Sequence, residues 1–101
     1  IEAANDDGDT ALMLAAWHGH TDVVQLLVDR GADIEAANDD GHTALMLAAL
    51  DGHTDVAQLL IDRGADIEAA NDDGDTALML AAWHGHTDVV QLLVDRGADI
   101  E

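Results

Sequence analysis

Hydrophobic positions in this chain fall into two kinds of short segment, and both kinds recur along it. Residues 10–16 read TALMLAA, and the same seven letters occupy residues 43–49 and 76–82. Alanine, leucine and methionine favour helices, and threonine is a good N-terminal cap. We therefore predict a helix from Thr10 to residue 17 or 18 in the first copy, ended by Gly19 in a left-handed turn. Because nearly every position is apolar and so short a helix is marginal alone, neighbouring structure must enclose it.

The second kind of segment is amphipathic. Residues 21–30 read TDVVQLLVDR, with valines and leucines on one side of a helix and polar residues on the other. We expect Thr21 to cap this helix and Asp22 to lie in its first turn. Arg30 is expected in the last turn, where a cation suits the helix dipole, and Gly31 ends the helix.

A tight turn and an extended stretch complete a unit that repeats every 33 residues. Asn5-Asp6-Asp7-Gly8 has the composition of a tight turn. The units span residues 1–33, 34–66 and 67–99, and residues 100–101 begin a further hairpin. The first and third units are identical, and the middle one differs from them at five positions. We interpret residues 1–101 as one domain without distinct capping repeats, since such repeats are atypical and more polar.

The order helix, turn, helix and extended loop, at this period, resembles the ankyrin repeat. The resemblance covers the whole chain and is carried by GDTALMLAA, GHTDVVQLL and RGADIEA. It implies an all-α fold, a solenoid of stacked helix-turn-helix units with short β-hairpin loops. In two places the chain departs from the family pattern: alanine replaces its proline, and methionine replaces its next histidine. Losing that histidine should remove a hydrogen-bond link between neighbouring hairpins. The substituted positions are Ala11, Ala44 and Ala77, and Met13, Met46 and Met79.

Charge limits the partners that the chain can bind. Twenty-two acidic residues stand against three arginines, lysine is absent, and the net charge is −19. Nucleic acids and anionic membranes are excluded because their phosphates require lysine and arginine. A protein or peptide of basic character, or a metal ion, is the natural ligand.

The residue types that are absent add further limits. Without cysteine the chain has no disulfide or thiolate site. No apolar run is long enough to span a membrane and no signal segment opens the chain, so we expect a soluble protein and leave its compartment open. Serine, tyrosine, phenylalanine and proline are missing too, which is typical of a designed consensus or a recent duplication.

The positions at which the units differ are the best candidates for binding. Asp9 becomes His42, Trp17 becomes Leu50 and His18 becomes Asp51 in the middle unit. The resemblance places these positions, with the hairpin aspartates, along a concave groove that contacts partners. The implied function is a non-enzymatic protein–protein interaction scaffold, with two tryptophans and a leucine as apolar anchors. The predicted partner-binding residues are Asp6, Asp7, Asp9, Trp17, His18, Asp39, Asp40, His42, Leu50, Asp51, Asp72, Asp73, Asp75, Trp83 and His84.

Two other functions stay open. The chain is alternatively a structural or designed module without a specific partner, whose uncapped ends stack head to tail. A third interpretation is calcium binding by the acidic hairpins, although the remaining ligands of an EF-hand loop are missing. The candidate calcium ligands are Asp6, Asp7, Asp9, Asp39, Asp40, Asp72, Asp73 and Asp75.

The remaining histidines and the carboxylates favour simpler interpretations. Equivalent positions of successive units alternate between histidine and aspartate and form two columns: Asp9, His42 and Asp75 in one, and His18, Asp51 and His84 in the other. Zinc ligands must converge on one point, which residues spread along such columns do not, so we expect exposed charge pairs between neighbouring units instead. His20, His53 and His86, at the start of the second helices, are interpreted as structural hydrogen-bond donors. No cysteine, serine, lysine or tyrosine offers a nucleophile, and the threonines are assigned to caps, so we expect no enzyme activity and no cofactor apart from that possible calcium ion.

Overall fold

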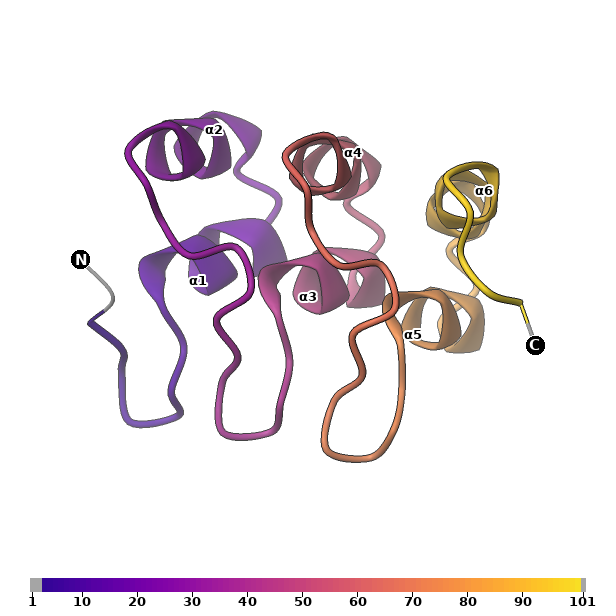
Figure 1. Ribbon diagram of the computed structural model, residues 1–101, viewed down its shortest axis with the longest axis horizontal. Coiled ribbons are helices and arrows are strands. Elements are labelled where there is room, and N and C mark those ends of the chain that lie inside the picture. Colours follow the sequence, from indigo (N-terminus) through magenta and orange to yellow (C-terminus); the bar gives the residue numbers. More distant parts are fainter. Residues whose placement is uncertain (1–2, 101) are drawn as a thin grey trace.

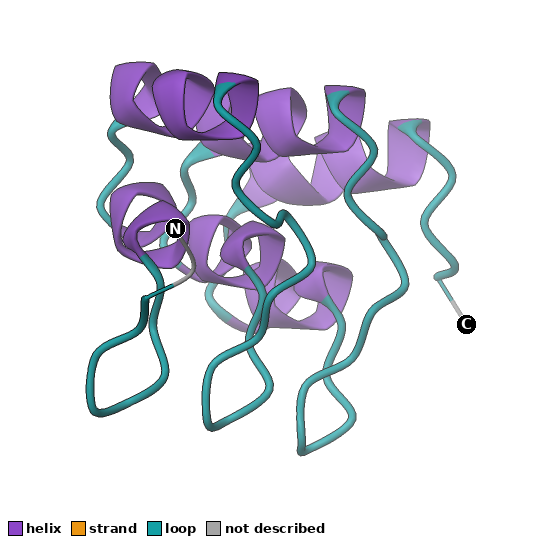
Figure 2. Ribbon diagram, turned by 60° about the vertical axis from the view of Figure 1, so that its left-hand side comes forward, coloured by secondary structure: helices purple, strands orange, loops and turns teal. Residues whose placement is uncertain are grey.

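Six helices form two parallel rows in the computed structural model, which describes residues 3–100. The inner row is α1 (Ala11–Trp17), α3 (Ala44–Leu50) and α5 (Ala77–Trp83). The outer row is α2 (Thr21–Asp29), α4 (Thr54–Asp62) and α6 (Thr87–Asp95). Figures 1 and 2 show the hairpin loops projecting beyond the inner row, on the side away from the outer helices. The predicted all-α solenoid is confirmed. None of the helices in the described part is long and apolar enough to cross a membrane.

The inner helices begin and end where the sequence predicts. The Thr10 hydroxyl accepts a hydrogen bond from the backbone N–H of Met13 at 3.3 Å, which satisfies one of the first free donors of α1. The same bond caps α3 and α5. Gly19 follows α1 with a φ of 74°, a conformation that glycine adopts without steric cost.

Two details of the outer helices were predicted wrongly. His20, not Thr21, is the N-cap of α2, and it makes no capping bond through its side chain. The carbonyl of His20 already accepts from the Val24 N–H at 3.0 Å, so Thr21 lies inside the first turn. Arg30 is the C-cap and not a last-turn residue, because its N–H still bonds to Leu26 and Leu27 while its own φ and ψ have left the helix.

The hairpins are tight loops and contain no regular strands in residues 3–100. Isolated antiparallel bridges join Ala4 to Thr10 and Ala70 to Thr76. Each loop closes on its asparagine: the side-chain oxygen of Asn5 accepts from the N–H groups of Asp7 and Asp9 at 3.0 and 2.9 Å. These bonds replace strand pairing and fix the shape of the tip.

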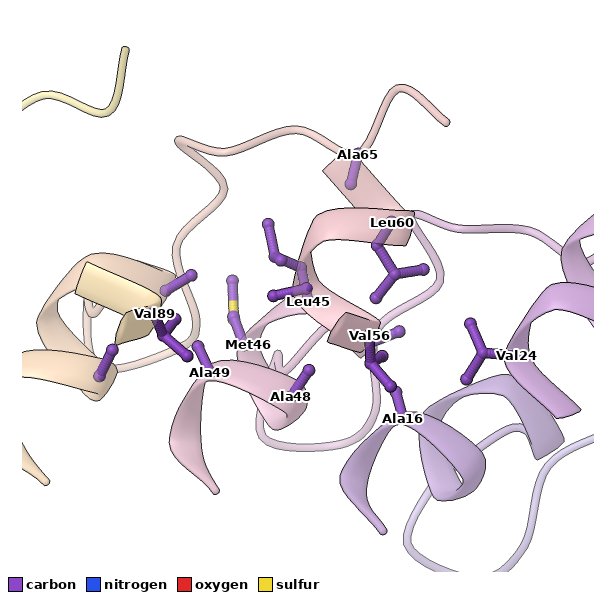
Figure 3. Close-up of a cluster of buried hydrophobic side chains, with 14 of the residues drawn as sticks. Ala16, Val24, Leu45, Met46, Ala48, Ala49, Val56, Leu60, Ala65 and Val89 are labelled. Atoms are coloured by element: carbon purple, nitrogen blue, oxygen red, sulfur yellow. The ribbon is translucent and has the colours of Figure 1, made fainter. Parts of the chain in front are cut away.

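The core lies between the two rows and continues from unit to unit (Figure 3). In the middle unit all six residues from 44 to 49 are buried, so the expectation that the inner helix is enclosed is confirmed there. Fewer are buried in α1 and α5, each of which has a neighbouring unit on one side only. Packing against a neighbouring unit therefore completes the burial of an inner helix, as expected for a solenoid.

Candidate functional site

A depression of about 270 Å³ opens between the first two hairpins and the inner helices behind them. The hairpins contribute polar walls, and α1 and α3 contribute Trp17, Leu47 and Leu50 as apolar walls. We call this space the inter-hairpin depression. Its lining residues are Asp7, Asp9, Trp17, Asn38, Asp40, His42, Leu47 and Leu50. Six of these eight come from the predicted partner-binding set, so the fold brings residues of two units together at one place.

The three predicted apolar anchors differ in how far they are exposed. Trp17 and Leu50 are half-buried, whereas the Trp83 side chain is 81% exposed. The two tryptophans belong to identical units, so the difference comes from the neighbouring unit: α3 packs beside α1, whereas in residues 3–100 no further inner-row helix packs on the other side of α5. The His18 ring stacks on Trp17 at a centroid distance of 5.7 Å and adds to the rim beside it.

Asp9 and His42 are occupied in holding neighbouring hairpins together. Asp9 is only 7% exposed and accepts a hydrogen bond from Asn38 Nδ2 at 2.8 Å. His42 is half-buried, and its Nε2 lies 3.2 Å from Asn71 Nδ2. The predicted charge pair between Asp9 and His42 is therefore wrong, because each of these side chains binds an asparagine of the next unit instead. Sequence reasoning missed both asparagines and assigned them only to turns.

Backbone bonds also join the hairpins. The Asp39 N–H donates to the Asp7 carbonyl at 3.0 Å, and the Asp72 N–H donates to the Asp40 carbonyl at 3.1 Å. The backbones of neighbouring hairpins are thus linked even though methionine replaces the family's histidine. Met13 and Met46 are instead buried, each 1% exposed.

The other predicted binding residues lie on the surface. Asp75 is half-buried, and the rest are exposed around the hairpin tips and at the ends of the inner helices. The exposed set is Asp6, Asp7, Asp39, Asp40, Asp72, Asp73, His18, Asp51 and His84. The acidic tips therefore form a rim, with the inter-hairpin depression behind the first two of them.

The outer helices carry ion pairs between units that the sequence analysis did not foresee. Arg63 lies 2.7 Å from Asp29, and Arg96 lies 2.7 Å from Asp62. The hydrogen bond from Arg63, with a smaller contribution from Gln25, lowers the pKa of Asp29 below its ordinary value. The 34-residue spacing of each pair, one unit plus one residue, is a signal that could have revealed them.

Of the three histidines in the inter-helix turns, His86 makes the kind of structural hydrogen bond that was expected. His86 Nε2 lies 2.9 Å from the Leu50 carbonyl oxygen, one unit back along the chain. His53 packs against Gly19 so closely that a β-carbon there would lie 2.6 Å from Nδ1. Both rings thus join successive units.

Metal binding finds no geometrical support within residues 3–100. No group of three or more histidine, aspartate or glutamate side chains there is arranged to hold an ion. The candidate calcium ligands are spread over three hairpin tips, and a calcium titration is the test of that interpretation.

The stacked helical hairpins and the projecting loops, with the depression between the first two of them, define a repeat solenoid. Residues 35–101 match the sequence model described as ankyrin repeats (3 copies), and residues 7–39 match that of the single ankyrin repeat. The chain therefore belongs to the ankyrin repeat family, as its motifs indicated. Ankyrin repeats are generally protein–protein interaction modules, and proteins built from them are typically non-enzymatic. The comparison with curated proteins gave no match.

Proposed function

We propose that the chain is an interaction scaffold that holds an apolar side chain of a basic protein segment in the inter-hairpin depression. The observation that carries this proposal is the lining itself. Trp17, Leu47 and Leu50 form apolar walls, and the carboxylates of Asp7 and Asp40 lie at the same place. A leucine or aromatic side chain flanked by lysine or arginine is complementary to that arrangement.

The charge distribution supports a basic partner. Each of the three arginines is the C-cap of an outer helix, so none lies on a hairpin. The tips carry exposed aspartates on every unit. Such a surface accelerates the approach of a cationic segment and contributes less to its final affinity.

The apolar contact supplies the selectivity. Complete burial of one leucine or phenylalanine side chain stabilises a complex by about 1.5–3 kcal/mol. That corresponds to roughly a 10- to 150-fold gain in affinity over a partner without the side chain. Polar contacts from His18 and from the Asp39 tip add to the rim around this anchor.

Peptide titration followed by NMR tests the proposal. One peptide carries a leucine between lysines, and its counterpart carries glycine in place of the leucine. We expect the leucine peptide to bind at least about tenfold more tightly, with shifts centred on Trp17 and Leu50. Asp40→Asn should weaken binding, whereas the matched control Asp55→Asn removes an equal charge from the outer helix α4 and should not.

Two outcomes of the titration would contradict the proposed site. Equal affinities for the two peptides, or equal losses in Asp40→Asn and Asp55→Asn, would mean that net charge alone attracts the peptides. The proposed site would then be wrong.

A further inference from the structure

His42 belongs to two structural features at once. It lines the inter-hairpin depression, and its ring also contacts Asn71 on the third hairpin. The ring is half-buried, so part of its surface is shielded from water. The first and third units carry an aspartate at this position, Asp9 and Asp75. The middle unit therefore places in the depression a residue type that ordinarily changes its charge between pH 5 and 8.

The bond between His42 and Asn71 requires a neutral ring. Asn71 is 9% exposed, and its amide oxygen accepts from the backbone N–H groups of Asp73 and Asp75. The amide nitrogen therefore faces His42 Nε2, at 3.2 Å, and it can only donate. A proton on Nε2 would set two donors against each other. Protonation thus breaks this bond and frees the ring from the third hairpin.

Two other contacts between units do not depend on a neutral histidine in this way. At the first joint the acceptor for Asn38 is the carboxylate of Asp9, at 2.8 Å. Aspartate as a residue type titrates about 2.6 pH units below histidine, so a carboxylate acceptor persists in mild acid. His86 Nε2 lies against the Leu50 carbonyl, so it is a donor and keeps its bond when the ring gains a second hydrogen. Of these three contacts, mild acid breaks the one at His42.

The charged groups around His42 are carboxylates. Two on the first hairpin and one on its own hairpin line the depression with it, and two more belong to the residues that hold the Asn71 amide on the third hairpin. From the inner helices, the depression receives the apolar side chains of Trp17, Leu47 and Leu50, with the titratable ring of His18 stacked on Trp17 at the rim. The five carboxylates are those of Asp7, Asp9, Asp40, Asp73 and Asp75.

We propose that protonation of His42 lowers the affinity of the inter-hairpin depression for basic segments, so that the site binds its partner at neutral pH and releases it in mild acid. This inference rests on the proposed function. A protonated His42 leaves Asn71 and pairs with the carboxylates that otherwise meet the lysine or arginine of the partner. It also repels that cation directly. Two like charges about 4 Å apart in water change a binding constant about fivefold.

Titration of the lysine-flanked leucine peptide at about pH 7.5 and about pH 5.5, at one ionic strength, tests the proposal. The peptide keeps its charge over this range, because lysine titrates near pH 10.4. His42→Asp removes the ring and restores the acceptor that the other two units carry. His20→Asp is the matched control. It removes one histidine and gives the same net charge, at an exposed N-cap outside the depression where aspartate is favoured.

We expect the parent chain and His20→Asp to lose affinity on acidification by about fivefold more than His42→Asp does. The free protein gives a second measurement that needs no peptide. In NMR spectra the side-chain amide signals of Asn71 should move together with the ring signals of His42 as the pH falls. Those of Asn71 should stay in place in His42→Asp. Circular dichroism establishes that each variant is folded at both pH values.

The outcomes separate this inference from the proposed function. Preference for the leucine peptide at pH 7.5, together with equal losses of affinity in His42→Asp and His20→Asp on acidification, overturns this inference alone. Asn71 signals that do not follow His42 also overturn it, because the joint would then be insensitive to the proton. Equal binding of the leucine and glycine peptides at pH 7.5 overturns the proposed function, and this inference with it.

Discussion

Asn71 Nδ2 lies 3.2 Å from His42 Nε2 at the joint between the second and third hairpins. The oxygen of the same amide accepts from the backbone N–H groups of Asp73 and Asp75 at 3.0 and 2.9 Å. These two bonds fix the orientation of the amide, so its nitrogen must be the atom that faces the histidine. An amide nitrogen only donates, and His42 Nε2 is therefore the acceptor.

The first prediction is that neutral His42 carries its ring hydrogen on Nδ1. Nitrogen chemical shifts of the ring measure this directly, and a hydrogen found on Nε2 would contradict the geometry. His42→Asp should restore the acceptor that Asp9 provides at the first joint and change the free energy of unfolding little. His42→Ala removes the acceptor from a nearly buried amide and should cost about 1 kcal/mol in urea denaturation.

The second prediction separates the two tryptophans. Trp83→Ala should change the free energy of unfolding by no more than about 0.5 kcal/mol, because the side chain is 81% exposed. Trp17→Ala should cost more, about 1–2 kcal/mol, since the ring is half-buried and lines the inter-hairpin depression with residues of the second unit, yet less than the ~3–5 kcal/mol typical of a core aromatic. Urea denaturation at low salt measures both. Equal losses would mean that the rings have the same structural role.

The helices, the N-caps of the inner row and the stacked fold could be predicted from the sequence because they depend on local rules repeated three times. The Thr10 cap and the Gly19 turn follow from a single residue and its neighbours. The family resemblance then supplied the stacking that these local rules leave open.

The features that could not be predicted from the sequence are contacts between residues of neighbouring units. The difference between Trp17 and Trp83 has no local signal, since both follow the same 33-residue sequence. Asp9 was predicted to face a partner and is instead nearly buried against Asn38, a residue 29 positions away. Such contacts depend on the offset between stacked units, which composition and periodicity do not determine.

The third prediction concerns acid. The pKa of Asp29 is lowered in the folded state by the hydrogen bond from Arg63, so its contribution to stability is present above the unfolded value of 3.8. That contribution is lost as pH falls through the lower, folded pKa, where Asp29 becomes protonated. Arg63→Gln should raise the pKa of Asp29 toward its ordinary value in an NMR titration. Arg96→Gln removes the equivalent arginine, which pairs with Asp62, and serves as the control. Equal shifts in the two variants would mean that the general loss of positive charge, and not the Arg63 contact, controls Asp29.

The last prediction concerns calcium. A protein calcium site supplies six to eight oxygens at about 2.3–2.6 Å. The hairpin aspartates instead stand on separate tips, and residues 3–100 contain no cluster of three or more suitable ligands. We therefore expect calorimetry at physiological ionic strength to show no saturable heat. The melting temperature should rise equally with calcium, magnesium or sodium chloride of matched ionic strength, because all three screen the repulsion within a chain of charge −19. Saturable heat that is lost in Asp40→Asn but kept in Asp55→Asn would contradict this expectation. It would show that two neighbouring tips, with water as the remaining ligands, hold an ion between them.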